Sequence, residues 1–155
     1  MRQAVLAFAG LVFSCSFASA EWKYIHKQDP MTDKSTYQSM NISKDGRFAL
    51  VVTCDHADPH HIALVSIHDR KFFGPVDYVY MRFGNDAPKP GLGTASDSIL
   101  TFRFPIIIRD GIEKSDRLRV RFEMGLRTDD TEFDVSGAEV QLRKLDYECL
   151  GLKSR

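Results

Sequence analysis

The clearest pattern along the chain is a strict alternation of apolar and charged residues over positions 117–124. The apolar set is Leu118, Val120, Phe122 and Met124, and the charged set is Arg117, Arg119, Arg121 and Glu123. Side chains two residues apart share one face of a strand, so one set meets a core and the other meets water. The segment is therefore predicted to be a half-buried β-strand.

A second alternation precedes it at positions 47–54, where Phe48, Leu50, Val52 and Cys54 fall on one face. Asp45-Gly46 before this strand is a tight-turn signal, so residues 37–42 are expected to pair with it as a hairpin. Further β-type runs lie at 61–68, 76–83 and 99–104. Short strands at this spacing indicate a mainly β fold, either an antiparallel β-sandwich or an open barrel.

The period changes near the end of the chain, where a C-terminal helix is expected over about 137–150. Ser136 and Glu139 have the spacing of a capping box, and Gly151 is a stop signal. One stripe that would pack on the sheet contains Ala138, Leu142, Leu145 and Cys149. Upstream, Pro105 ends the strand over 99–104, and residues 106–113 are expected to form a short helix or a turn.

The first 20 residues have the pattern of a cleaved signal peptide. Arg2 precedes an apolar stretch over 4–13 that is too short to span a bilayer, and Ala18-Ser19-Ala20 is a small-x-small cleavage pattern. Lipidation at Cys15 is an alternative, although the bulky Phe13 opposes it. The prediction is a single domain over 21–155 with no integral membrane segment, located in a bacterial periplasm or secreted.

Removal of the signal would leave two cysteines, Cys54 and Cys149. In an oxidising compartment such a pair is expected to form a disulfide. Closing a loop of about 95 residues would contribute on the order of 4 to 5 kcal/mol. The alternative is two free thiols that pack as small apolar groups.

Composition and charge narrow the classes of function. The chain has 21 basic and 21 acidic residues, so no overall field draws it to nucleic acid or to anionic lipid. It has no Gly-x-Ser-x-Gly elbow, and Gly91-x-Gly93 has no phosphate-loop lysine. We therefore expect a binding protein without a cofactor rather than an enzyme, and the oligomeric state stays open.

Two clusters could hold a metal ion. His56, Asp58, His60 and His61 follow a strand closely and offer imidazole and carboxylate ligands, although a solvated turn explains them equally. Asp129, Asp130, Glu132 and Asp134 supply hard oxygen ligands but no EF-hand spacing. A solvated hairpin that leads into a strand at Phe133 is the preferred interpretation of this acidic run.

The favoured binding surface combines a row of arginines with the long polar segment over 84–98. Three successive outward arginines can grip an anionic polymer or an acidic partner, and loops of this length are often functional. The candidate residues are Arg82, Arg117, Arg119, Arg121, Pro90, Gly91 and Leu92.

Several of these segments, in this order, resemble the VasI-type family of accessory proteins associated with bacterial type VI secretion. They are Trp22, Met31-Thr32-Asp33, the strand 50–54 that ends in cysteine, the arginine-bearing strand 79–83, the strand 116–122, and Phe133-Asp134-Val135-Ser136-Gly137 before a last helix. The resemblance implies a non-enzymatic adaptor that binds an envelope or secretion-apparatus protein. The alternatives are a periplasmic inhibitor or immunity-type protein that blocks a hydrolase or toxin, and a metal-binding protein.

Overall fold

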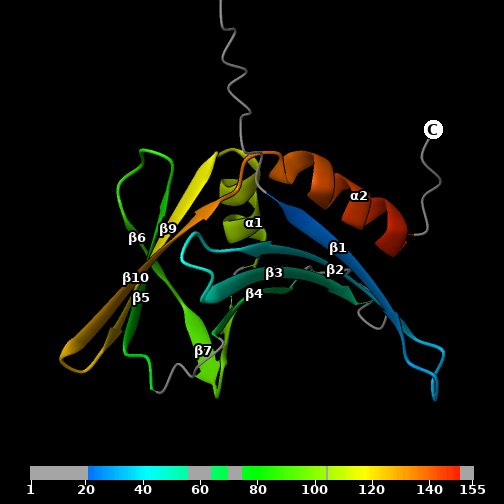
Figure 1. Ribbon diagram of the computed structural model, residues 1–155, viewed down its shortest axis with the longest axis horizontal. Helices are drawn as coiled ribbons and strands as arrows, with labels where there is room; N and C mark the ends of the chain where they lie inside the picture. Colours follow the sequence, from blue (N-terminus) through cyan, green and yellow to red (C-terminus); the bar gives the residue numbers. More distant parts are fainter. Residues whose placement is uncertain (1–20, 56–63, 70–74, 104, 151–155) are drawn as a thin grey trace, which may run out of the picture.

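Two antiparallel β-sheets and two α-helices make up the described part of the computed structural model, which comprises residues 21–55, 64–69, 75–103 and 105–150 (Figure 1). The six-stranded sheet contains, in spatial order, β1 (Trp22–Gln28), β2 (Ser35–Ile42), β3 (Phe48–Asp55), β4 (Leu64–Asp69), β8 (Ile99–Phe102) and β7 (Gly93–Ser96). The four-stranded sheet contains β10 (Arg127–Asp134), β9 (Arg117–Met124), β5 (Tyr78–Phe83) and β6 (Lys89–Gly91). The mainly β, sandwich-like prediction is confirmed.

The alternating patterns form the two faces that they predict. In β9 the side chains of Leu118, Val120 and Phe122 are buried, whereas the intervening arginines lie on the outer face of the four-stranded sheet. In β3 the predicted inward positions are buried as well, and the rings of Phe48 and Phe122 stack with their centroids 5.2 Å apart. This contact joins the inner faces of the two sheets into one core.

The predicted hairpin between β2 and β3 is present. The two strands pair antiparallel from Ile42 opposite Ala49 to Thr36 opposite Asp55. Gly46 in the connecting turn has a φ of 70°, a conformation that favours glycine. The turn signal Asp45-Gly46 therefore located this hairpin correctly.

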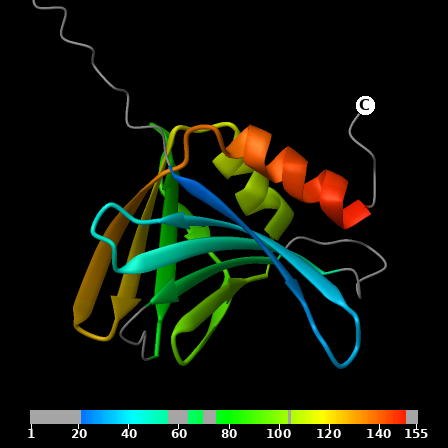
Figure 2. The ribbon, with the colours of Figure 1, turned by 45° about the vertical axis from the view of Figure 1, so that its right-hand side comes forward.

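Helix α1 (Pro105–Glu113) and helix α2 (Ala138–Leu150) follow the predicted change of period. Proline suits the first turn of α1, because it has no N–H to leave unpaired there. All four residues of the predicted stripe on α2 are buried: Ala138, Leu142, Leu145 and Cys149. Figure 2 shows α2 lying across β1, β2 and β3, which it contacts. Within the described residues, no helix has the length and apolar character needed to cross a bilayer.

The hydrogen bonds at the start of α2 differ from the predicted capping box. Ser136 Oγ donates to Asp134 Oδ1 at 2.7 Å, and the Asp134 carboxylate also accepts from the Ser136 N–H. Glu139 pairs with Arg143 one turn along the helix. Asp134 therefore takes the place of Glu139 as the partner of Ser136, because it lies closer along the chain.

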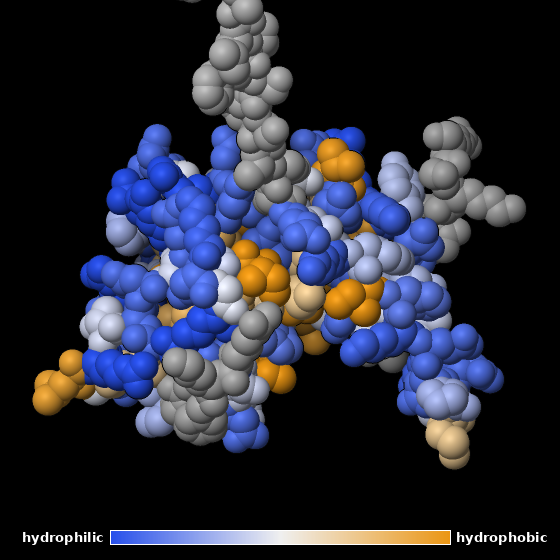
Figure 3. Space-filling view, viewed as in Figure 1, coloured by the Kyte–Doolittle hydropathy of each residue, from blue (hydrophilic) through white to orange (hydrophobic). Residues whose placement is uncertain are grey.

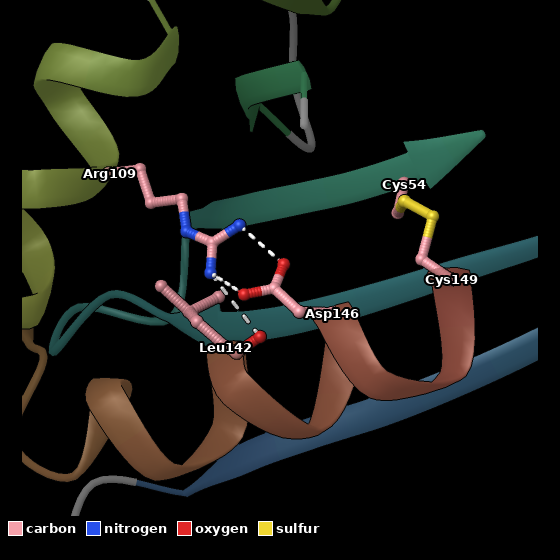
Figure 4. The surroundings of a disulfide bond; sticks show 5 residues. All are labelled: Cys54, Arg109, Leu142, Asp146 and Cys149. Atoms are coloured by element: carbon pink, nitrogen blue, oxygen red, sulfur yellow. Dashed lines mark hydrogen bonds and ion pairs between the residues drawn. A yellow bond between two sulfur atoms is a disulfide. The ribbon is translucent and has the colours of Figure 1, made fainter. Parts of the chain in front are cut away.

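Two connections hold α2 in place (Figure 4). Cys149 near its end forms the predicted disulfide with Cys54 of β3, with the two Cα atoms 6.1 Å apart. Nearer the middle of the helix, the Arg109 guanidinium of α1 donates to the carboxylate of Asp146 and to the carbonyl oxygen of Leu142. The helix is thus attached both to a sheet and to the other helix.

The segment 84–98, predicted to be one long loop, contains two short strands. β6 pairs with β5 in the four-stranded sheet, and β7 pairs with β8 in the six-stranded sheet, with only Leu92 between them. Both are edge strands, where a proline such as Pro90 is tolerated because its missing N–H is not needed on the free side. The two strands were not predicted from the sequence, because the segment is rich in proline and glycine, which are typical of loops.

A charged network joins the sheets near β10. Arg47 donates to both carboxylate oxygens of Asp69 at the end of β4, at 3.1 and 2.7 Å, and to Asp129 of β10 at 2.9 Å. The Asp69 side chain is 0% exposed. A carboxylate at this depth needs such partners, since burial of an unpaired charge is strongly unfavourable.

Candidate functional site

A groove of about 650 Å³ runs along the outer face of the four-stranded sheet. Its outward lining includes Tyr80, Arg82, Pro88, Arg119, Arg121 and Glu132. These side chains come from β5, β9, β10 and the approach to β6. Most candidate arginines of the sequence therefore share one hollow with part of the segment 84–98.

Strand register determines which groups meet in the groove. Tyr80 of β5 lies opposite Pro90 of β6 on one side and Arg121 of β9 on the other, and Arg121 lies opposite Asp130 of β10. Directly opposed residues on one face are close enough for their side chains to interact. The row therefore runs from an apolar rim at β6 to an acidic rim at β10.

The adjacent row brings two arginines together. Arg82 of β5 lies opposite Arg119 of β9, which lies opposite Glu132 of β10. Arg119 Nε donates to Glu132 Oε2 at 2.8 Å, and Glu132 also pairs with Lys44. These two bonds, the one from Lys44 first, hold the pKa of Glu132 below its usual value. Glu132 is thus fully engaged by groups other than Arg82.

Arg121 is paired as well. Its Nε and one terminal nitrogen donate to the two oxygens of Asp130 at 2.7 and 2.8 Å, which is a bidentate arrangement. The bond from Arg121 lowers the pKa of Asp130. Two of the three arginines that the alternation places on the outer face are therefore neutralised within the sheet, which corrects the picture of a continuous basic surface.

Arg82 and Arg117 differ from their neighbours. Within the part of the chain that the structure describes, neither forms an ion pair with a carboxylate, and the Nε atom of each is buried without a hydrogen-bond partner. One terminal nitrogen of Arg117 is 3.5 Å from Asn85 Oδ1, which is a weak contact. Arg82 lines the groove and has no partner of this kind.

The candidates of the segment 84–98 separate into different environments. Pro90 is exposed and lies opposite Tyr80 in the strand pairing, whereas Leu92, 58% exposed, connects β6 to β7. Gly91 packs inside the fold, because a Cβ on it would lie 2.7 Å from Met81 Cε and 3.3 Å from Phe102 Cε1. Gly91 therefore allows a close approach of the chain, and none of the three candidates Pro90, Gly91 and Leu92 is among the residues that line the groove.

The two candidate metal clusters have different outcomes: the histidine-rich one lies outside the described residues, and the carboxylates of the acidic run bind other groups of the protein. His56, His60, His61 and Asp58 lie outside the described residues. In the acidic run, Asp129 pairs with Arg47 and Arg127, and the other three carboxylates accept bonds described above. No group of three or more potential ligands gathers among the described residues. Phe133 is buried in β10, as the hairpin interpretation expects.

A serine–histidine pair that the sequence did not suggest occurs on the other sheet. Ser66 Oγ and His68 Nε2 are 2.9 Å apart on β4, and burial lowers the pKa of His68. Ser66 is only 7% exposed, and among the described residues no carboxylate contacts the ring to orient it as a base. The pair therefore has the geometry of a structural contact and not of an activated nucleophile.

Sequence reasoning also missed Tyr80 of the groove, and it included Pro88 only as part of the segment 84–98. The aromatic residue belongs to an ordinary strand pattern, and the proline reads as part of a loop. Comparison of the chain with protein families, with curated proteins and with solved structures found no match, so the resemblance to the VasI-type family stays a prediction.

Proposed function

We propose that this chain is an exported, non-enzymatic binding protein of the bacterial envelope, which holds a partner protein in the groove on its four-stranded sheet. The observation that carries the proposal is the half-buried Arg82 guanidinium, which lines the groove without a carboxylate partner among the described residues. A charged group left in this state is unfavourable for the free protein. Such a group is typical of a surface that is completed by a partner.

The charges around the groove favour a protein over an anionic polymer. Glu123, Asp130 and Glu132 line the same hollow as the arginines. A polyanion laid along it would be repelled by these carboxylates, whereas a protein surface can present charges of both signs in the right places. We therefore set aside a polymer as the ligand of the arginine row.

The Cys54–Cys149 disulfide supports export. Disulfides persist in oxidising compartments and are rare in a reducing cytosol. The signal peptide over 1–20 lies outside the described residues and stays a prediction. Within this proposal, the resemblance to the VasI-type family suggests a more specific role as an accessory or adaptor of type VI secretion.

A second candidate function is an inhibitor that inserts a rigid loop into an enzyme. The β9–β10 connection is a two-residue turn, with Gly125 at a φ of 62° and Leu126 109% exposed at its tip. Figure 3 shows an apolar spot at this tip, at the lower left of a mostly hydrophilic face. An apolar side chain on a short, paired hairpin suits insertion into a pocket of an enzyme.

Site-specific photocrosslinking in the native envelope separates these functions. A photoreactive phenylalanine derivative replaces Tyr80 in the groove, Leu126 at the hairpin tip or, as the control, Tyr147 on the exposed side of α2. The adaptor proposal expects one envelope or secretion-apparatus protein captured from position 80 and not from position 147. Capture of a periplasmic hydrolase from position 126 alone would replace it with the inhibitor function. Equal capture from all three positions would contradict both.

A further inference from the structure

We infer that Arg82 is the centre of a subsite that binds a single carboxylate of the partner protein. This inference rests on the proposed binding function and adds the chemistry of the contact. The carboxylate belongs either to an Asp or Glu side chain or to a chain terminus.

Arg82 is one of five half-buried arginines in the part of the chain that the structure describes. Three of them, Arg47, Arg109 and Arg119, are paired with carboxylates, and the other two are Arg82 and Arg117. Most half-buried arginines among the described residues thus form an ion pair with a carboxylate, whereas the guanidinium of a fully exposed arginine can donate its hydrogen bonds to water. Among the described residues, Arg82 and Arg117 depart from this pattern, and of these two only Arg82 lines the groove.

The surroundings of Arg82 add like charge. Arg119 lies directly opposite it, and Arg117 and Arg121 lie at the diagonal positions of β9. Asp130 is engaged by Arg121, and Glu132 by Arg119 and Lys44. Four guanidinium groups thus lie close together, while the nearest acidic groups of β10 are committed to other cations. An incoming anion would relieve this repulsion, which favours binding.

The geometry of Arg82 specifies how the anion approaches. Its Nε is buried and unpartnered, but its two terminal nitrogens are not among the buried unpartnered atoms. They have no hydrogen-bond partner among the described residues either, so they are accessible to solvent, and Arg82 is one of the residues that line the groove. Two terminal nitrogens of a planar guanidinium match the two oxygens of a carboxylate, which forms a bidentate, charge-assisted contact.

The rest of the groove limits the ligand to one negative charge with apolar neighbours. Pro88 and Tyr80 form an apolar side next to Arg82, and Glu132 lies beyond Arg119. A second anionic group placed beyond Arg119 would meet Glu132. The expected ligand is therefore an acidic residue flanked by apolar or aromatic side chains, and not a cluster of acids.

Arginine-selective NMR tests the subsite directly. Spectra of the side-chain Nε–H groups are recorded while the folded protein is titrated with one of four probes at constant ionic strength. The probes are acetyl-Phe-Asp-Phe-amide, acetyl-Phe-Phe-Phe with a free C-terminal carboxylate, acetyl-Phe-Asn-Phe-amide and dextran sulfate. We expect a saturable shift at Arg82 with at least one of the first two peptides, and the better of these identifies the source of the carboxylate.

Three variants provide the comparison. Arg82→Gln should weaken the better peptide about 10-fold, as expected for loss of a charge-assisted pair. Arg82→Lys, which keeps the charge but loses the planar fork, should fall between Arg82→Gln and the unmodified protein. Arg143→Gln is the matched control, since Arg143 is exposed on α2 and pairs only locally with Glu139, and it should change affinity less than twofold.

The inference is overturned if the asparagine peptide binds as well as the aspartate peptide, if dextran sulfate alone binds, or if Arg82→Gln leaves the affinity unchanged. Thermal melting of Arg82→Gln shows whether the variant is folded, and Arg82→Lys retains the test if it is not. Crosslinking from position 80 that survives Arg82→Gln would refute the subsite and leave the binding function intact. A saturable Arg82 shift without any crosslinked partner would refute the binding function instead.

Discussion

The disulfide between Cys54 and Cys149 gives the strongest prediction about stability. The perturbation is reduction of the bond in the folded protein, compared with a Cys54→Ala, Cys149→Ala double variant. The two cysteines are 95 residues apart in the sequence. The chain-entropy expression converts a loop of this size into about 4.7 kcal/mol at 25 °C. A small domain is stable by only about 5 to 15 kcal/mol, so reduction removes a large share of the total.

Urea denaturation followed by far-UV circular dichroism measures this effect. Oxidised protein should unfold at a much higher midpoint than reduced protein, and with a smaller m-value, because the cross-link keeps the unfolded chain compact. The double variant should resemble the reduced protein and lose slightly more, since it also removes two buried sulfur atoms. A free energy difference below about 1 kcal/mol between the oxidised and reduced forms would refute the loop argument.

Four further predictions concern single positions. Arg47→Met should lower the free energy of unfolding by about 3 to 5 kcal/mol, because it removes the bidentate partner of the buried Asp69 carboxylate. Urea denaturation of a double variant, Arg47→Met with Asp69→Leu, should recover part of this loss. No recovery would contradict the prediction. Arg82→Met should leave the melting temperature unchanged or raise it, because it removes an unpaired half-buried charge; calorimetry that shows a large decrease would mean that the guanidinium is satisfied after all. Burial lowers the pKa of His68 from its ordinary 6.5, so the unfolded chain binds a proton on this ring at a higher pH than the folded protein does, and the free energy of unfolding falls as pH drops below about 6.5. His68→Gln should reduce this dependence of the free energy of unfolding on pH, as measured by denaturation at pH 7.5, 6.0 and 5.0. An unchanged dependence would exclude His68 as its source. Gly91→Ala should cost no more than about 1 kcal/mol, because the atom closest to the new Cβ is the end of the flexible Met81 side chain, which can move aside. A shift of the urea midpoint equivalent to about 3 kcal/mol would show that this side chain cannot move.

Local patterns in the sequence predicted most of the strands and the C-terminal helix of this fold. They predicted much less well which side chains and strands pair with one another. The alternation around Leu118 and the stripe that ends at Cys149 each placed buried side chains correctly, because one period and one core face determine them. Ser136 was assigned the wrong partner, since Asp134 competes for the same hydroxyl. The strands around Leu92 were missed, because edge strands tolerate residues that usually mark loops.

Three of the candidate residues, Arg82, Arg119 and Arg121, line the groove, but the sequence did not predict how the charges of this surface are paired. The sequence places Arg119 and Arg121 on an outer face, and it also contains the acidic run from Asp129 to Asp134. Only the register between β9 and β10 shows that Glu132 and Asp130 pair with these arginines, and nothing in either segment alone specifies that register. Among the described residues, Arg82 could be identified as a groove arginine without a carboxylate partner only after these pairs were known.

The continuous passage from β6 through Leu92 into β7 has a consequence for recognition. Pro90, which lies opposite Tyr80 of the groove, and the last strand of the opposite sheet belong to one short stretch of backbone, and a Cβ on Gly91 would crowd side chains of the core. Widening the hollow on one side would require breaking strand pairing on the other. The proposed binding surface is therefore preorganised, so that under this proposal a partner would lose little binding free energy to ordering it and would be selected by shape as well as by charge.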